Sequence, residues 1–129
     1  MNAPSVDIKD MLVAGNLSLV FAINLFIGME PDTPNDTVTI FDTPGFSPMR
    51  GLTAPNYFYP SIQVRVRDAS YLDAWDLIND IKVLLHNRAQ ETRNGTLYSA
   101  IFCSIEPALL DWDGSNRARF VTTFNIQRR

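Results

Sequence analysis

Apolar and polar residues alternate strictly in two segments of the chain. In residues 62–67, IQVRVR, every second residue is aliphatic and the residues between are Gln or Arg. In residues 117–126, RARFVTTFNI, Phe120, Phe124 and Ile126 fall on one side in the same way. A period of two is typical of a strand with one buried face. We therefore predict two strands, each with one apolar and one polar face.

A helical period follows the first of these strands. In residues 71–86 the apolar side chains recur three and four positions apart, at Tyr71, Ala74, Trp75, Ile78, Ile81 and Leu85. This spacing is typical of a helix that lies on a sheet, and Ser70 with Asp73 resembles a capping box at its start. A second, shorter helix is predicted after Pro4, with Ser5 as its cap and Gly15 at its end.

Continuous apolar runs predict the remaining strands. The run 17–28, LSLVFAINLFIG, is too uniformly apolar for a surface strand and indicates a central strand covered on both faces. Shorter runs at 38–42 and 97–105 predict two more strands. Gly, Asn and Ser interrupt the stretch 11–29 before it reaches the roughly 18 apolar residues of a membrane span. The residues before it are of mixed charge, so we expect neither a signal peptide nor a membrane protein.

Turn-forming residues separate these elements. They cluster at 30–37 and 87–96, at the predicted hairpin tip 111–116, and in the long segment 44–55 with its three prolines and two glycines. The order is helix, strand, strand, long loop, strand, helix, strand, strand. It predicts an α+β fold in which a mostly antiparallel sheet of four to five strands is covered by two helices. We expect a single domain spanning residues 1–129.

Composition narrows the possible functions. The chain has a formal net charge of -3 and a pI near 4.9, which argues against tight electrostatic binding of nucleic acid. A single cysteine, Cys103, and a single histidine, His86, allow no intrachain disulfide and no zinc knuckle. We interpret Cys103 as a small buried hydrophobe and His86 as a helix-end residue. No catalytic, cofactor-binding or metal-ligating residue is assigned.

Two short strings resemble ligand-binding motifs without the residues that must accompany them. The string DTPG at 42–45 resembles the switch of GTPases, where the Asp helps to hold magnesium. No glycine here is followed by lysine, so the phosphate cradle is missing, and Pro44 with Gly45 fits a type II turn. The string DWDGSN at 111–116 lacks the spacing and the final Glu of a calcium loop and fits a hairpin turn. The sequence thus points away from an enzyme.

The long segment 44–55 exposes apolar residues without a regular element to bury them. Loops of this length usually bind something, so we expect it to pack on a neighbouring subunit; the alternative is a flap folded on its own domain. We further predict that Arg65 or Arg67 pairs with a carboxylate, within the subunit or across an interface. The candidate residues for subunit contact are therefore Phe46, Met49, Arg50, Leu52, Arg65 and Arg67.

Three features in this order resemble the tail terminator proteins of long-tailed bacteriophages. They are the strand end FDTPG at 41–45, the strand IQVRVR at 62–67 running into a helix with Tyr71, and a final hairpin with an Asp-Gly turn before an arginine-bearing strand. Together they cover residues 36–127. Phe41 stands where this family often has Tyr.

The resemblance implies an α+β subunit that is not an enzyme and that assembles into a ring, usually a hexamer. Such a ring caps the finished tail tube and joins it to the head-tail connector, while DNA passes through the lumen without specific binding. The partners it implies are other copies of the chain, the tail tube protein and a connector or stopper protein, all in the virion. A head-completion or stopper protein of the phage neck is the alternative, and a small enzyme or nucleotide-binding module is a third.

Overall fold

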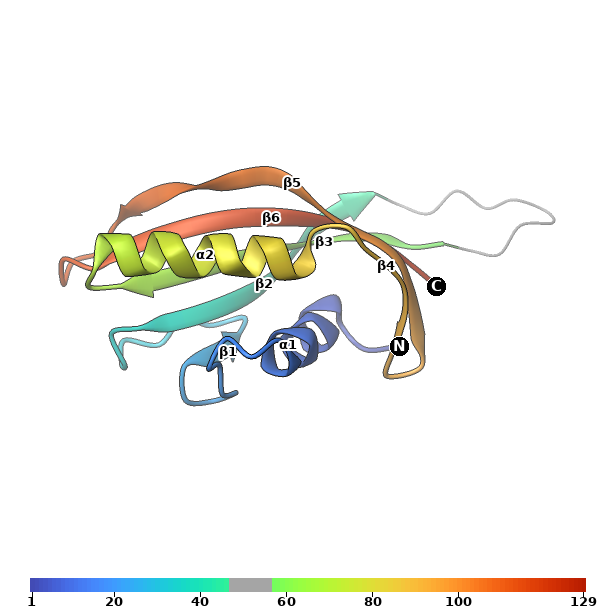
Figure 1. Cartoon of the computed structure of the whole chain (residues 1–129), viewed down its shortest axis with the longest axis horizontal. Helices are drawn as coiled ribbons and strands as arrows, with labels where there is room; N and C mark the ends of the chain where they lie inside the picture. The colour runs from blue at the N-terminus through green and yellow to red at the C-terminus, as the bar shows by residue number, and fades with distance from the viewer. Residues whose placement is uncertain (47–56) are drawn as a thin grey trace.

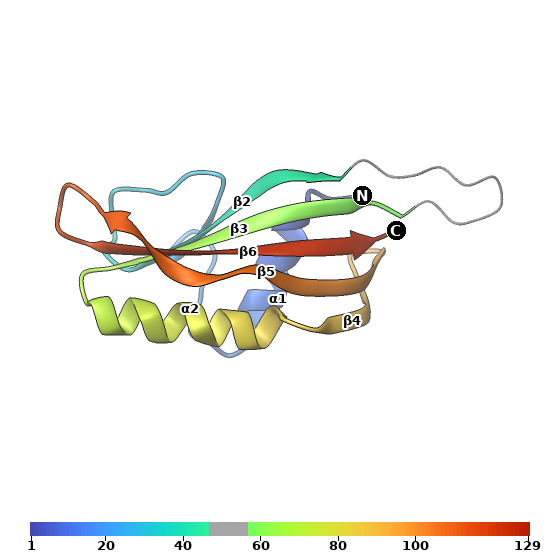
Figure 2. The ribbon, with the colours of Figure 1, turned by 90° about the horizontal axis from the view of Figure 1, so that it is seen from above.

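The computed structural model describes residues 1–46 and 57–129, which form two helices on one side of a single sheet (Figures 1 and 2). In chain order the elements are α1 (Pro4–Ala14), β1 (Leu25–Ile27), β2 (Thr37–Phe46), β3 (Tyr59–Asp68), α2 (Tyr71–Leu85), β4 (Arg88–Arg93), β5 (Thr96–Trp112) and β6 (Ala118–Arg128). The strand order is β1-β2-β3-β6-β5-β4, and every pair is antiparallel except β1 with β2. The predicted α+β class is confirmed.

The core lies between the inner face of the sheet and the two helices. On the central strands Ile62 faces Phe124 and Val66 faces Phe120, and all four side chains are at most 1% exposed. α2 packs over β6, β3 and β5, while α1 packs over β2 and β1 (Figure 2). Burying a large aliphatic or aromatic side chain contributes about 1.5–3 kcal/mol. The alternation predicted for both strands is therefore confirmed and supplies the centre of the core.

The two helices begin in different ways. At α2 the prediction is confirmed, because the Ser70 hydroxyl accepts a hydrogen bond from the Asp73 amide. At α1 the prediction of Ser5 as the cap is wrong. Ser5 lies inside the helix, where its amide and hydroxyl donate to the Asp42 carboxylate at 3.1 and 2.7 Å. A carboxylate at a helix N-terminus satisfies free amides and complements the helix dipole, so Asp42 ties α1 to β2.

The prediction of a central strand at 17–28 is wrong. Only β1 forms there, and it lies at the edge of the sheet. Residues 15–24 fold back on themselves, with Asn16, Ser18 and Ala22 at positive φ. An apolar run alone cannot distinguish a covered strand from a loop whose apolar side chains have other partners.

The sheet is also larger than the predicted four to five strands, because the described residues form six. The predicted polar loop 87–96 contains β4, which pairs with the start of β5. β5 itself continues past Pro107 to Trp112, with register shifts that let it stay paired to β6. Bulges absorb the missing proline donor and bend the strand, so Pro107 does not end it.

The DTPG string is an irregular end of a strand and not the predicted turn. β2 stays paired with β3 through Phe46, with a register shift between Thr43 and Phe46. A Cβ atom at Gly45 would lie 2.0 Å from the carbonyl oxygen of Tyr59. Glycine is thus required here by the close approach of the β3 backbone.

We predict that Gly45→Ala lowers the free energy of unfolding by about 1–3 kcal/mol, because the added methyl group must displace the β3 backbone. Gly114→Ala is the matched control, since a Cβ atom there meets no atom within 4 Å. Urea unfolding monitored by circular dichroism measures both variants. Equal midpoints for the two variants would show that the close approach at Gly45 does not matter for stability.

Candidate assembly surface

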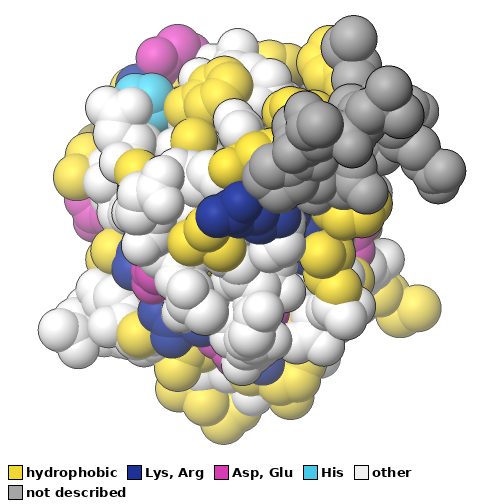
Figure 3. Space-filling view, turned by 90° about the vertical axis from the view of Figure 1, so that its right-hand side faces the viewer, with side chains coloured by type: hydrophobic (Ala, Val, Ile, Leu, Met, Phe, Trp, Pro, Cys, Tyr) yellow, Lys and Arg dark blue, Asp and Glu magenta, His cyan; other side chains and the backbone are white. Residues whose placement is uncertain are grey.

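One of the predicted contact residues, Phe46, lies at the end of the sheet beside residues 47–56. Phe46 is 78% exposed at the end of β2, whereas Met49, Arg50 and Leu52 lie outside the described residues. Figure 3 looks onto this end and shows hydrophobic side chains next to Lys and Arg side chains. An exposed aromatic residue close to cationic groups is typical of a protein contact surface.

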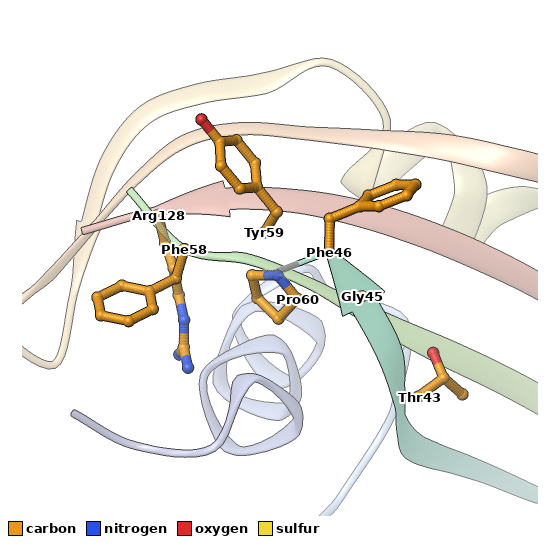
Figure 4. Close-up of a pocket in the computed structure, with 7 residues that line it drawn as sticks. All are labelled: Thr43, Gly45, Phe46, Phe58, Tyr59, Pro60 and Arg128. Atoms are coloured by element: carbon orange, nitrogen blue, oxygen red, sulfur yellow. The ribbon is translucent and has the colours of Figure 1, made fainter. Parts of the chain in front are cut away.

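Two hollows border Phe46. The first, of about 270 Å³, is lined by Thr43, Gly45, Phe46, Phe58, Tyr59, Pro60 and Arg128 (Figure 4). The second, of about 180 Å³, is lined by Phe46, Tyr59, Phe102, Asn125, Ile126 and Gln127. In Figure 4 the rings of Phe46 and Tyr59 project from β2 and β3 on the side of the strands away from the Arg128 side chain. The surface around Phe46 is therefore uneven and apolar enough to receive side chains of another protein.

A buried polar cluster stabilises the base of this surface. The guanidinium of Arg128 donates to the carbonyl of Asn2 at 2.8 Å and to the Tyr98 hydroxyl at 3.2 Å. The Tyr98 hydroxyl donates to Asp7, a carboxylate that also accepts from Asn94 at 2.7 Å. Burial, followed by the hydrogen bond to Asp7, raises the pKa of Tyr98 above its ordinary value. Since these groups bond one another, the cluster joins α1 to β5 and β6 and has a structural role.

The two arginines of β3 have different environments. Arg67 is 3% exposed; it pairs with Glu30 at 3.1 Å and donates to the carbonyls of Asp32, Pro34 and Asn35. The predicted arginine–carboxylate pair is thus confirmed within the subunit, although the partner lies in the 30–35 segment and not on α2. Its function here is to hold that segment against the sheet.

Arg65 is partly exposed and engaged less tightly. Its Nε donates to Gln63 at 3.0 Å, and its guanidinium lies 4.8 Å from the centre of the Phe41 ring. Within the described parts of the chain no carboxylate forms an ion pair with it. Stacking on an aromatic ring orients an arginine while leaving donors available, so Arg65 is the β3 arginine that is able to contact a second protein.

An ion-pair network extends the anchoring of Arg67 across the outer face of the sheet. Arg119 forms a two-bonded fork with Asp111 at 2.6 and 2.5 Å, and this hydrogen bonding holds the pKa of Asp111 below its ordinary value. Arg117 pairs with Asp113 at 2.7 Å and with Asp32 at 3.1 Å. The predicted hairpin tip is thus a tight turn closed by its own ion pairs, with Asp113 bonded to Arg117 rather than arranged for calcium.

Two further groups of exposed apolar residues lie at the edges of the sheet. One contains Tyr71, Leu72, Trp75 and Trp112, although the sequence pattern assigned Tyr71 and Trp75 to the buried face of the helix. The other contains Val20, Phe21 and Ile23, in the run mistaken for a central strand. The helical period could not show how much of these side chains the rest of the fold covers, and they remain 40–68% exposed.

The polar groups that the sequence singled out for possible chemistry have structural partners. Among the described residues, no group of three His, Cys, Asp or Glu side chains is placed to hold a metal ion. Asp42, the candidate magnesium ligand of a GTPase, binds α1 instead. His86 is the C-cap of α2, and its Nδ1 accepts from the Cys103 amide at 2.9 Å. Cys103 is only partly buried, against the edge of the core.

Contiguous exposed apolar groups on a rigid fold are typical of a protein that assembles with other proteins. The chain matches the family described as bacteriophage tail terminator protein over residues 6–129, and it belongs to that family. It is therefore a structural component of the virion tail and has no enzymatic role. The match favours the tail terminator prediction over the head-completion or stopper alternative.

The fold also occurs in a solved virion. A chain of the structure titled "Virion of native gene transfer agent (GTA) particle" superposes with a TM-score of 0.72 at 11% sequence identity. The alignment covers 98% of this chain and 94% of that chain, so the two folds agree along almost their whole length.

A search among curated proteins finds no match. In the part of the chain that the structure describes, no helix is long and apolar enough to cross a membrane.

We predict that Glu30→Gln destabilises the protein by about 3 kcal/mol, because it leaves Arg67 buried without its counter-charge. Glu106→Gln is the matched control: Glu106 pairs with Lys82, but its side chain is 76% exposed, and solvent screens such pairs. Thermal unfolding of both variants at pH 7 gives the comparison. A Glu30→Gln melting temperature equal to that of the control would mean that the carbonyl contacts alone fix Arg67.

Proposed function

We propose that the protein forms a closed ring, a hexamer, that caps the tail tube and joins it to the head-tail connector. The observation that carries this proposal is the family match over residues 6–129. A tube that has reached its final length presents identical subunits around its end. A ring of identical subunits with the same symmetry can satisfy all of them at once.

The exposed surfaces support a ring subunit. A closed ring needs two different complementary patches on each subunit, one for each neighbour, and further surfaces for the tube and the connector. The protein exposes large apolar side chains at both sheet edges and at the end that carries Phe46. Scattered exposed apolar residues are normal, but contiguous groups mark interaction surfaces.

The segment 44–55 is proposed to contact a neighbouring protein. We place this contact at the end of the sheet beside residues 47–56. Phe46 supplies an aromatic group at this end that is 78% exposed. Arg65 pairs with Thr39 of β2, seven residues along the strand from Phe46, so its guanidinium, oriented by Phe41, belongs to a separate proposed contact. Aromatic residues and arginine contribute most to binding energy in protein interfaces. Arg67 contributes indirectly, because it holds the 30–35 segment in place. Met49, Arg50 and Leu52 belong to the same proposed contact as Phe46.

The charge balance suits a conduit for DNA. The subunit has a net charge of -3, and the arginines of the outer sheet face, Arg67, Arg117 and Arg119, are paired with carboxylates. Tight phosphate binding requires unpaired cations. We propose that DNA crosses the lumen without specific binding; a strongly basic lumen in a ring structure would contradict this.

We predict that Phe46→Ser reduces the yield of infectious particles at least about tenfold, as expected for loss of an aromatic interface anchor. The melting temperature of the purified protein should not change, since the side chain is exposed. Val83→Ser is the control: Val83 is 80% exposed on α2, far along the helix from its first turn. Plaque assays in a phage lacking the gene measure yield, and negative-stain microscopy shows whether rings sit on the tails.

Equal yields from the two variants would remove Phe46 from the proposed contact. Tails without any ring in the presence of the wild-type protein would refute the ring itself.

A further inference from the structure

We infer that the 15–24 loop of one subunit docks onto an aromatic patch of the next, and that this pair of surfaces closes the ring. The 15–24 loop presents Val20, Phe21 and Ile23; the aromatic patch consists of Tyr71, Leu72, Trp75 and Trp112. The inference rests on the proposed ring and names the surfaces that join its subunits.

The 15–24 loop is held in one shape while its apolar side chains face outward. The Asn24 side chain accepts from the Val20 amide at 2.7 Å and donates to the Ser18 carbonyl at 3.0 Å. The Ala22 amide donates to the Leu25 carbonyl at 2.9 Å, and Ala22 itself adopts a positive φ of 68°. A non-glycine residue in this conformation costs free energy, and such strain often marks a functional segment.

The core does not account for the apolar composition of this loop. Of its large aliphatic and aromatic residues Leu19 is buried and Leu17 packs partly buried against the core, whereas Val20, Phe21 and Ile23 are 50%, 47% and 63% exposed. Three fixed apolar side chains at a turn therefore form a projecting contact, in which the Lys9 ammonium lies 4.8 Å from the centre of the Phe21 ring.

The aromatic patch offers a broad, rigid surface. The rings of Tyr71 and Trp112 stack with centroids 6.1 Å apart, and Tyr71 and Trp75 both pack on the buried Phe120, at 4.9 and 5.7 Å. Leu72, 68% exposed, adds an aliphatic group on the first turn of α2. Rigid aromatic side chains lose little conformational entropy on binding, which is why they dominate contact energies.

The two surfaces lie apart on the subunit. The loop precedes β1, at one edge of the sheet, and the patch lies at the start of α2 and the end of β5, several strands away (Figure 1). A contact between two different patches repeats from subunit to subunit and closes into a ring when the rotation allows. A second copy of the chain is thus the occupant that fits both surfaces at once.

Charge favours the same occupant. Asp73 and Asp76 are exposed on α2 beside the aromatic patch, so a partner segment with acidic residues would be repelled. The stretch 11–29, which contains the loop, has no charged residue at all. The chain as a whole has a net charge of -3, but the uncharged 15–24 loop can approach α2 without like-charge repulsion.

The test uses one variant for each surface, Ile23→Asp for the loop and Leu72→Asp for the aromatic patch. Both side chains are more than 60% exposed, and an Asp in the first turn of α2 suits the helix dipole, so both variants should fold with wild-type melting temperatures. Val83→Asp, at an α2 residue that is 80% exposed and lies away from the first turn of the helix, adds the same charge outside both surfaces. Light scattering at increasing concentration measures association.

We expect each variant alone to associate at least about tenfold more weakly than the wild type, the effect of losing an interface anchor, and Val83→Asp to behave as wild type. The decisive measurement is an equimolar mixture of the two variants. Ile23→Asp keeps an intact patch and Leu72→Asp keeps an intact loop. The mixture should therefore form a one-to-one dimer of twice the 14.5 kDa chain mass, although neither variant associates alone.

Three outcomes would overturn the inference. If either variant forms rings at the wild-type concentration, the subunits of the proposed ring must meet through other surfaces. Rings that form but fail to attach to tails would assign the two surfaces to another virion protein. A mixture that stays monomeric would show that the 15–24 loop and the aromatic patch do not bind each other. Rings formed by the wild-type protein in the same series would distinguish this result from failure of the ring proposal.

Discussion

The antiparallel pairing of β3 with β6 is the constraint on which the rest of the structure depends. These strands are central in the sheet, and their register places Ile62 opposite Phe124 and Val66 opposite Phe120. Because side chains alternate along a strand, this register buries the apolar face under both helices and turns Arg65, Arg67 and Arg119 to the other face. A shift by one residue would exchange the two faces and leave neither helix a surface to pack on.

Charged side chains then fix the segments that the core does not hold. Asp42 caps the distant helix α1, Arg67 gathers the carbonyls of the 30–35 segment, and Arg128 ties the N-terminal residues to the end of β6. Arg67 and Arg128 are buried and have several partners, as a buried charge requires, whereas Asp42 is exposed and accepts two hydrogen bonds from Ser5. From the sequence alone these side chains are candidates for catalysis or ligand binding. In the structure they form hydrogen bonds within the subunit instead. The protein therefore uses its charges for anchoring and leaves its exposed apolar groups for contact.

The combination of paired charges and exposed apolar groups fits a structural component of a virion tail. An enzyme needs polar groups that remain unsatisfied until substrate binds, whereas an assembly subunit needs preformed surfaces of defined shape. Here the exposed apolar groups sit on rigid supports: stacked rings at the start of α2, a hydrogen-bonded turn before β1, and the glycine-dependent end of β2. Rigid presentation keeps the entropy lost on assembly small.

The sequence by itself determined what depends on local periodicity. The alternation at 62–67 and 117–126, the helix capped by Ser70 and the α+β class all follow from side chains at regular spacing, and an incomplete phosphate motif was enough to exclude a GTPase. Only the tertiary structure decided where apolar runs and lone charges would go. The run 17–28 became a loop followed by the short edge strand β1, the DTPG carboxylate became a helix cap, and Tyr71 and Trp75 reached the surface. The reason is that burial and ion pairing depend on residues distant in sequence, which periodicity does not report.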